Sequence, residues 1–310
     1  MAKRVSVINF KGGVGKTTLA FHLATGLARH HGSRVLLVDM DHQSSLSIVA
    51  LGGAVWDEVA AAGETVTRVF RNFLGSEFPG REIVKPTSFG AYSPYASKVQ
   101  VVPASLDLDD TEIELTAAHQ GETAQSPWNK RTLMCRWLEE TELDEEFDYI
   151  VFDCAPATKV VSQNAIAASH GYIIPVVPEA VMERGAPHLR NMIRSGIDQK
   201  LRSWSKIGDA RSMYVPDTKL VGLVVTRIQV HGMARSGYTN DHTQHLGTLK
   251  DRWGDELVEP YIKQGVGVGE ALTDRVPVYD RPYSQNVGRR GIDRQFKELT
   301  EALKVRMDGL

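Results

Sequence analysis

The stretch Lys11-Gly12-Gly13-Val14-Gly15-Lys16-Thr17-Thr18 decides the fold of this 310-residue chain. An apolar run at residues 5–10 comes directly before it, and apolar residues recur at helical spacing after it. A glycine-rich loop between a strand and a helix lets backbone N–H groups point at a phosphate, and the helix N-terminus adds its positive dipole. The stretch therefore predicts a nucleotide-binding loop in which Lys16 reaches the β- and γ-phosphates and Thr17 ligates Mg²⁺.

Apolar runs and helical patterns alternate along the rest of the chain. Further strands are expected at residues 35–38, 99–102, 149–153, 172–177 and 220–226, and helices at about 66–74, 106–119, 130–141 and 292–307. Unbroken apolar strands suit a parallel sheet that is covered on both faces. The pattern predicts an α/β fold with a doubly wound, mostly parallel sheet flanked by helices. We expect a single P-loop ATPase domain over residues 1–310, with an elaboration at about 53–97.

Composition indicates an ordinary globular protein, with 42% hydrophobic and 24% charged residues. The two cysteines, Cys135 and Cys154, form no close-spaced metal or redox pattern, so we expect a reduced, cytoplasmic setting. No apolar stretch approaches the ~18 residues of a membrane span, and no signal peptide is evident. The formal net charge of −2 means that any contact with DNA must come from a local basic patch.

Acidic residues follow two of the expected strands. Asp39 and Asp41 come after the strand at 35–38, and Asp153 ends the strand at 149–153. Residues just past the carboxyl ends of parallel strands lie at the edge of the ligand crevice. Four apolar residues followed by Asp153 match the Walker B pattern, whose carboxylate holds Mg²⁺ directly or through water. The alternative for Asp39 is a capping role at a strand–helix turn.

The loop departs from the general phosphate-loop pattern, because Phe10 occupies the position of the first glycine and Lys11 stands at its start. In this deviant Walker A motif the sequence resembles the ParA/MinD ATPases, and most closely the ParA partition ATPases without an N-terminal DNA-binding domain. The resemblance implies that Lys11 crosses a dimer interface to the partner's nucleotide. It also implies that Asp41 orients the attacking water and that Asp39 lies near Mg²⁺. Family-like segments recur at residues 101–108, 112–115, 164–165, 174–179, 270–271 and 277–278, which leaves only about 53–97 uncovered.

Two departures from the family pattern concern the nucleotide site. His42 replaces the usual proline after Asp41, and Lys263 takes the position of a proline that helps to frame the adenine in the family. The neighbouring Pro260 is our candidate for the framing role. Residues 226–227, at the end of an expected strand, are a second candidate for adenine recognition.

The resemblance implies an ATP- and Mg²⁺-dependent homodimer that binds DNA without sequence preference in the nucleoid. It implies that a ParB-like or cargo-adaptor protein stimulates hydrolysis, so that a plasmid, a chromosome or another cargo is positioned. The C-terminal basic residues are our candidate DNA contacts: Arg275, Arg289, Arg290, Arg294 and Lys297. A solvated helix face of mixed charge is the alternative interpretation of these residues.

Three other functions share the loop motif. A MinD-like membrane switch would end in an amphipathic membrane-binding helix, but acids interrupt the polar face of the helix at 292–307, so we expect it to pack on the core and expect no membrane partner. An iron–sulfur reductase needs cluster ligands that two scattered cysteines do not supply. A small-molecule ligase needs a second substrate pocket, for which the sequence shows no motif.

Overall fold

The strands form one sheet. The computed structural model describes residues 1–89, 95–120, 125–156, 159–206, 214–230, 237–281 and 291–310. Its strands are β1 (Lys3–Val7), β2 (Val35–Met40), β3 (Lys85–Pro86), β4 (Val99–Val102), β5 (Tyr149–Cys154), β6 (Gly171–Val176), β7 (Lys219–Val225) and β8 (Leu257–Val258). Within the described residues the order across the sheet is β3-β4-β2-β5-β1-β6-β7-β8, and every pairing is parallel except that of β3 with β4. The predicted doubly wound, mostly parallel α/β fold is confirmed.

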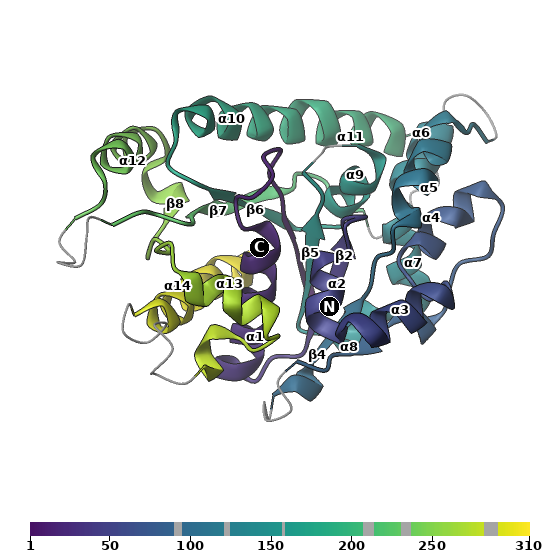
Figure 1. Ribbon diagram of the computed structural model, residues 1–310. Helices are drawn as coiled ribbons and strands as arrows, with labels where there is room; N and C mark the ends of the chain where they lie inside the picture. The colour runs from purple at the N-terminus through teal and green to yellow at the C-terminus, as the bar shows by residue number, and fades with distance from the viewer. Residues whose placement is uncertain (90–94, 121–124, 157–158, 207–213, 231–236, 282–290) are drawn as a thin grey trace.

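Helices connect the strands. They are α1 (Lys16–His31), α2 (Ser45–Leu51), α3 (Gly53–Ala61), α4 (Thr67–Arg71), α5 (Asp107–Ala117), α6 (Ser126–Arg131), α7 (Leu133–Thr141), α8 (Leu143–Glu146), α9 (Val160–Ala167), α10 (Ala180–Asn191), α11 (Gln199–Ser205), α12 (Asn240–Trp253), α13 (Val266–Thr273) and α14 (Ile292–Asp308). A π-helical stretch, Met192–Asp198, joins α10 to α11. Figure 1 shows α10 and α11 on one side of the sheet and α1, α13 and α14 on the other.

The sheet separates two apolar cores, because alternate side chains of each strand point to opposite faces. Ile150 and Phe152 of β5 belong to the core shared with α9 and α10. Tyr149 and Val151 belong to the core shared with α1 and α14. Burial on both faces explains why the strands appear in the sequence as continuous apolar runs.

Several predicted boundaries differ from the structure. The first strand ends at Val7, because residues 8–10 already lead into the loop. The helix expected at 130–141 is interrupted at Thr132, which separates α6 from α7. The two-residue strands β3 and β8 were not predicted, since two residues are too few to show any periodicity.

Residues 53–97 contain the helices α3 and α4 and the strand β3, which lies at the edge of the sheet. Val69, Phe70 and Phe73 are buried in the same core as Leu36 and Val38 of β2. The helix α3 was not predicted, and it lies beside α2 at the end of the molecule where Figure 1 also places α4 and α5.

The final helix packs on the core. Its apolar stripe (Phe296, Leu299, Leu303 and Met307) is buried, and α14 lies against α1. Among the described residues, no helix is both long enough and apolar enough to cross a membrane.

Candidate nucleotide site

The glycine-rich loop joins β1 to α1 in a conformation that its glycines make possible. Gly13 and Gly15 have φ angles of 72° and 82°, in the left-handed region that side chains other than glycine's enter at a cost. Between them the fully buried Val14 anchors the loop to the core. Helix α1 then starts at Lys16 without a side-chain cap from the described residues, so its first N–H groups remain available to an anion.

Two residues at the end of β7 hold the loop from the other side. The Thr226 hydroxyl donates to the Val14 carbonyl at 2.7 Å, and the Arg227 guanidinium donates to the Gly13 carbonyl at 2.6 Å. Sequence reasoning proposed these two residues for adenine recognition and missed this contact with the loop backbone. Their place after a strand was the available signal, and only the neighbouring position of β7 and β6 in the sheet brings them to the loop.

Lys16 points into the site and is 8% exposed. Its ammonium donates to the Lys11 carbonyl at 3.2 Å. Burial lowers the pKa of Lys16, and the negative charges of Asp153 and Asp41 oppose that shift. A desolvated ammonium binds phosphate oxygens strongly, because less water is present to screen the attraction between the opposite charges.

Asp39 and Asp153 lie side by side on β2 and β5, where they are directly paired in register. Asp39 is fully buried; one of its oxygens accepts hydrogen bonds from the Ser47 amide and hydroxyl, and the other accepts one from the Asp41 amide. Within the described chain, neither oxygen of Asp153 has a partner at hydrogen-bond geometry. Burial raises the pKa of both carboxyl groups, and the charge of Asp39 raises that of Asp153 further.

These residues fit a divalent cation. Two buried carboxylates that repel each other gain most from a bound positive charge, and Asp153 has both oxygens available. The Thr17 hydroxyl interacts with Asp153 and lowers its pKa, which places a neutral oxygen ligand beside it. Asp39 is committed to Ser47 and would act through water. The described residues contain no cluster of three His, Cys, Asp or Glu that could hold a metal, so a cation bound here would need oxygens of phosphate and water as further ligands, as is usual for Mg²⁺.

Asp41 lies in the loop between β2 and α2. One of its oxygens accepts the Gln43 amide at 3.0 Å, which folds the loop into a local turn. The carboxylate is 15% exposed and is among the groups that line the nucleotide cavity. It therefore faces the cavity in front of the glycine-rich loop.

Lys11, at the start of the glycine-rich loop, forms an ion pair with Glu179, at the start of α10. Both side chains are about two-fifths exposed. An ion pair this exposed contributes little to stability, so the lysine is free to exchange Glu179 for another anion.

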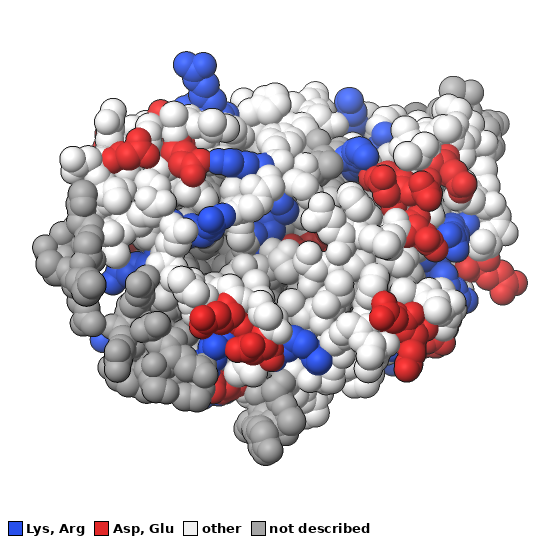
Figure 2. Space-filling view, viewed as in Figure 1, with Lys and Arg blue, Asp and Glu red and all other residues white. Residues whose placement is uncertain are grey.

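A cavity of about 1270 Å³ opens in front of the loop. Its far wall comes from residues between 262 and 275, including Lys263, Gly265 and Val266 of the altered family segment. Among the described residues that line it, Pro260 is absent; it lies at a cis peptide bond ahead of this wall. Figure 2 shows a hollow near the centre of this face with Lys and Arg around it.

The candidate DNA contacts fall into three groups. The guanidinium of Arg275 donates to the Val49 and Ser88 carbonyls, which ties it to neighbouring backbone. Arg294 and Lys297 lie exposed on α14, each opposite an acid one turn further on. Arg289 and Arg290 lie outside the described residues.

Comparison with known proteins gives the family. A family model described as an AAA domain matches residues 2–205. The chromosome-partitioning ATPase Soj of Thermus thermophilus is 30% identical over 232 residues, which cover 74% of this chain and 76% of that protein. The chain belongs to the ParA/Soj family of P-loop ATPases. This ParA/Soj-family ATPase is also 26% identical to the sporulation initiation inhibitor protein Soj of Bacillus subtilis, over 90% of both chains. It is 28% identical to the chromosome partitioning protein ParA of Caulobacter vibrioides, over 88% of this chain and 85% of that protein.

Solved structures share the fold of this ParA/Soj-family chain. Apo McdA of Cyanothece has a TM-score of 0.70 at 20% identity, covering 98% of this chain and all of that one. A putative plasmid partition protein of Borrelia burgdorferi bound to AMPPNP has a TM-score of 0.66 at 16% identity, covering 99% and 100%. Cobyrinic acid a,c-diamide synthase of Mycobacterium smegmatis, with a bound ATP analogue and magnesium, has a TM-score of 0.66 at 21% identity, covering 98% and 94%.

Proposed function

We propose that this chain is an Mg²⁺-dependent ATPase that dimerises on ATP, binds DNA without sequence preference and positions a plasmid, a chromosome or another cargo. A ParB-like or cargo-adaptor protein would stimulate hydrolysis, and the protein would work on the nucleoid in the cytoplasm. The observation that carries the proposal is a site that combines residues 11–18 with Asp39, Asp41 and Asp153, in a chain that aligns with a chromosome partitioning protein over 88% of its length.

In this proposal the loop residues bind the phosphates of ATP, and the acids hold Mg²⁺ and the attacking water. The N–H groups of residues 12–18 and the ammonium of Lys16 hold the β- and γ-phosphates of ATP. Bound Mg²⁺ would neutralise phosphate charge, with Thr17 and Asp153 as ligands and Asp39 behind a water. Asp41 orients the water whose oxygen attacks the γ-phosphorus. The bond from that phosphorus to the bridging β-phosphate oxygen breaks, and ADP, inorganic phosphate and a proton are left. Pro260 stands ahead of the wall that would hold the adenine.

The proposal of an ATP-dependent dimer rests on Lys11, which is partly exposed at the start of the loop. Its exposed pair with Glu179 can be replaced by the phosphates of a nucleotide on a second subunit. The γ-phosphate then bridges two chains, and its loss weakens their interface, which is the logic of a nucleotide switch. The subunit interface would open again after hydrolysis.

DNA binding rests on the exposed basic residues Arg294 and Lys297, with Arg289, Arg290 and Arg275 as further candidates. The i,i+4 pairs of Arg294 and Lys297 are exposed, so phosphates can displace the acids at little cost. A dimer presents two such surfaces, and weak contacts that act together reinforce each other.

The test is DNA binding and sedimentation measured with ATP, with ADP and without nucleotide. We expect a dimer that binds DNA in ATP alone, with an affinity that falls steeply with salt because counterions are released. The double variant Arg294→Glu/Lys297→Glu should bind DNA far more weakly, whereas Lys200→Glu, exposed on α11, should bind normally. Equal DNA affinity in ATP and ADP would contradict the proposal.

The other readings of the fold have less support. The likeness to cobyrinic acid a,c-diamide synthase is one of fold, at an identity where fold alone is shared. A reductase would need accessible thiolates, but Cys135 and Cys154 are buried, and burial raises the pKa of the Cys135 thiol to about 12. A MinD-like anchor would need the apolar stripe of α14, which lies against α1.

A further inference from the structure

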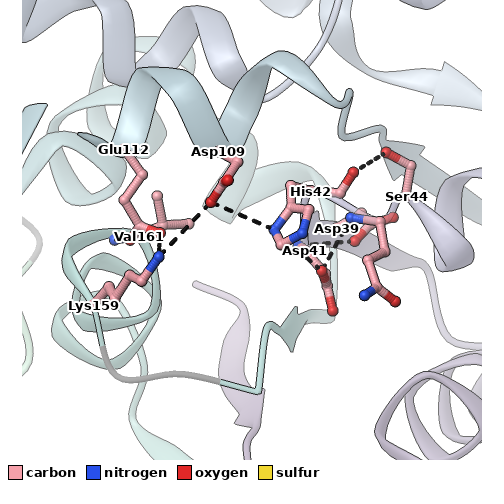
Figure 3. A network of polar contacts seen from close by, with 9 residues as sticks. Asp39, Asp41, His42, Ser44, Asp109, Glu112, Lys159 and Val161 are labelled. Carbon is pink, nitrogen blue, oxygen red and sulfur yellow. Dashed lines mark hydrogen bonds and ion pairs between the residues drawn. The ribbon is translucent and has the colours of Figure 1, made fainter. Parts of the chain in front are cut away.

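Helix α5 lies beside the loop after β2 and the start of α9. It follows β4, which neighbours β2, and β2 in turn neighbours β5. The loop after β2 holds Asp41, and α9, the next helix after β5, begins at Val160. Figure 3 shows the side chains of α5 reaching toward both elements.

One side chain of α5, Asp109, stands between His42, in the loop after β2, and Lys159, at the start of α9. Its Oδ1 lies 4.0 Å from Nδ1 of His42, and that same nitrogen lies 3.8 Å from Oδ1 of Asp41. On the other side, the Lys159 ammonium lies 3.7 Å from the same Oδ1 of Asp109. A chain of charged and polar groups thus runs from Asp41 through His42 and Asp109 to Lys159 (Figure 3).

A buried neighbour on the same helix holds α5 to α9. Glu112 is 8% exposed and accepts the Val161 amide at 2.8 Å, which caps the first turn of α9. Burial raises the pKa of Glu112, and the amide of Val161 and the charge of Lys159 oppose that shift. Lys159, just ahead of α9, lies 3.9 Å from the other oxygen of Glu112. Helix α5 is therefore held to α9 by a buried hydrogen bond, whereas its contact with His42 is longer and weaker.

We infer that Asp109 is a positioning residue for hydrolysis: through His42 it holds Asp41, and through Lys159 it ties that loop to the start of α9. The inference rests on the proposed role of Asp41. Asp109, His42 and Lys159 are each about 40–56% exposed and their separations are long, so each contact is worth at most about a two- to fivefold change in an equilibrium. Contacts this weak do not decide the fold, but they are sufficient to shift a carboxylate that must aim a water.

The tie depends on a histidine at position 42. The ParA-like pattern carries a proline after the second aspartate, which stiffens the loop by itself. A histidine leaves the backbone freer and brings a side chain that reaches α5. Support that a proline supplies within the loop is here supplied from the neighbouring helix.

The experiment compares Asp109→Asn with Asp110→Asn in the full chain. Asp110 is exposed on the same helix, and no contact with the loop after β2 or with Lys159 is found for it among the described residues, so it is the matched control. We expect Asp109→Asn to lower kcat for ATP about two- to fivefold while KM and the melting temperature stay unchanged, and Asp110→Asn to change none of them. His42→Gln should lower kcat in the same way, and the double variant should lose no more than the larger single loss.

Three results would overturn the inference: an unchanged kcat for Asp109→Asn, a rise in KM alone, or losses that multiply in the double variant. Asp41→Ala in the same assay separates this inference from the proposed function. If Asp41→Ala is inactive and Asp109→Asn is normal, only the positioning role of Asp109 is wrong. If Asp41→Ala turns over at the wild-type rate, the proposed function of that residue is wrong as well.

Discussion

Replacement of Asp153 by asparagine should stabilise the protein without ligands and abolish its response to Mg²⁺ and ATP. The carboxylate is buried, has no hydrogen-bond partner at proper geometry among the described residues and stands next to Asp39. A buried polar group without a partner costs about 1–3 kcal/mol in protein mutational data. Asparagine is also polar, so the variant does not remove that cost; it removes the charge that Asp39 repels. We therefore expect the free energy of unfolding to rise by an amount of the same order, about 1–3 kcal/mol.

The assay is thermal unfolding with a chelator and then with saturating Mg²⁺ and ATP. For a chain of this size, about 1–3 kcal/mol corresponds to a rise of roughly 2–6 °C in Tm without ligand. Ligand at about one hundred times its Kd should stabilise the wild type by about 2.7 kcal/mol. The Mg²⁺-dependent part of that gain should be missing in the variant.

A matched control comes from Asp198, a carboxylate that is 4% exposed but accepts a hydrogen bond from the Thr218 hydroxyl. It lies between α10 and α11, far along the chain from the loop, so Asp198→Asn should leave the ligand response intact. A lower Tm for ligand-free Asp153→Asn than for wild type would refute the reasoning about the unpartnered carboxylate. A full Mg²⁺-dependent shift in that variant would refute its assignment to the metal.

Three further outcomes are expected. Lys16→Ala should lose nucleotide binding in equilibrium titration, because the site loses its buried ammonium; unchanged affinity would remove the phosphate-loop assignment. Asp41→Ala should bind Mg²⁺ and ATP, hydrolyse ATP far more slowly and accumulate as a dimer in sedimentation, and a wild-type rate would show that the water is held elsewhere. His22 is fully buried and burial lowers its pKa from 6.5 to about 4, so its neutral form contributes stability above pH 6.5 that is lost as the pH falls toward 4, by about 3 kcal/mol when complete. Denaturation of His22→Gln across this range should therefore show a stability deficit at pH 7 that narrows toward pH 4, and a deficit independent of pH would contradict it.

The order of elements could be predicted from the sequence because each long strand is buried on both faces. In strands such as β5 every residue is therefore buried, which makes the strand visible as a continuous apolar run in the sequence. The glycine loop between β1 and α1 has a residue spacing that few other structures require. The helix α3 and the strands β3 and β8 could not be predicted. Their side chains and backbone groups are satisfied by neighbours distant in sequence, such as the Ala104 carbonyl that accepts the indole of Trp56.

The residue types of the site could be predicted from the sequence, because Lys16 and Thr17 open the helix after the glycine loop and the acids stand at or just past the ends of β2 and β5. Only the tertiary structure decided how their charges are balanced. It pairs Asp39 with Ser47 and leaves Asp153 open, although both acids end similar strands. It also commits the guanidinium of Arg275 to the backbone of Val49 and Ser88. The physical reason is that local pattern places a side chain at an edge of the sheet, whereas its partners come from segments that meet there only when the sheet and its two helical layers assemble.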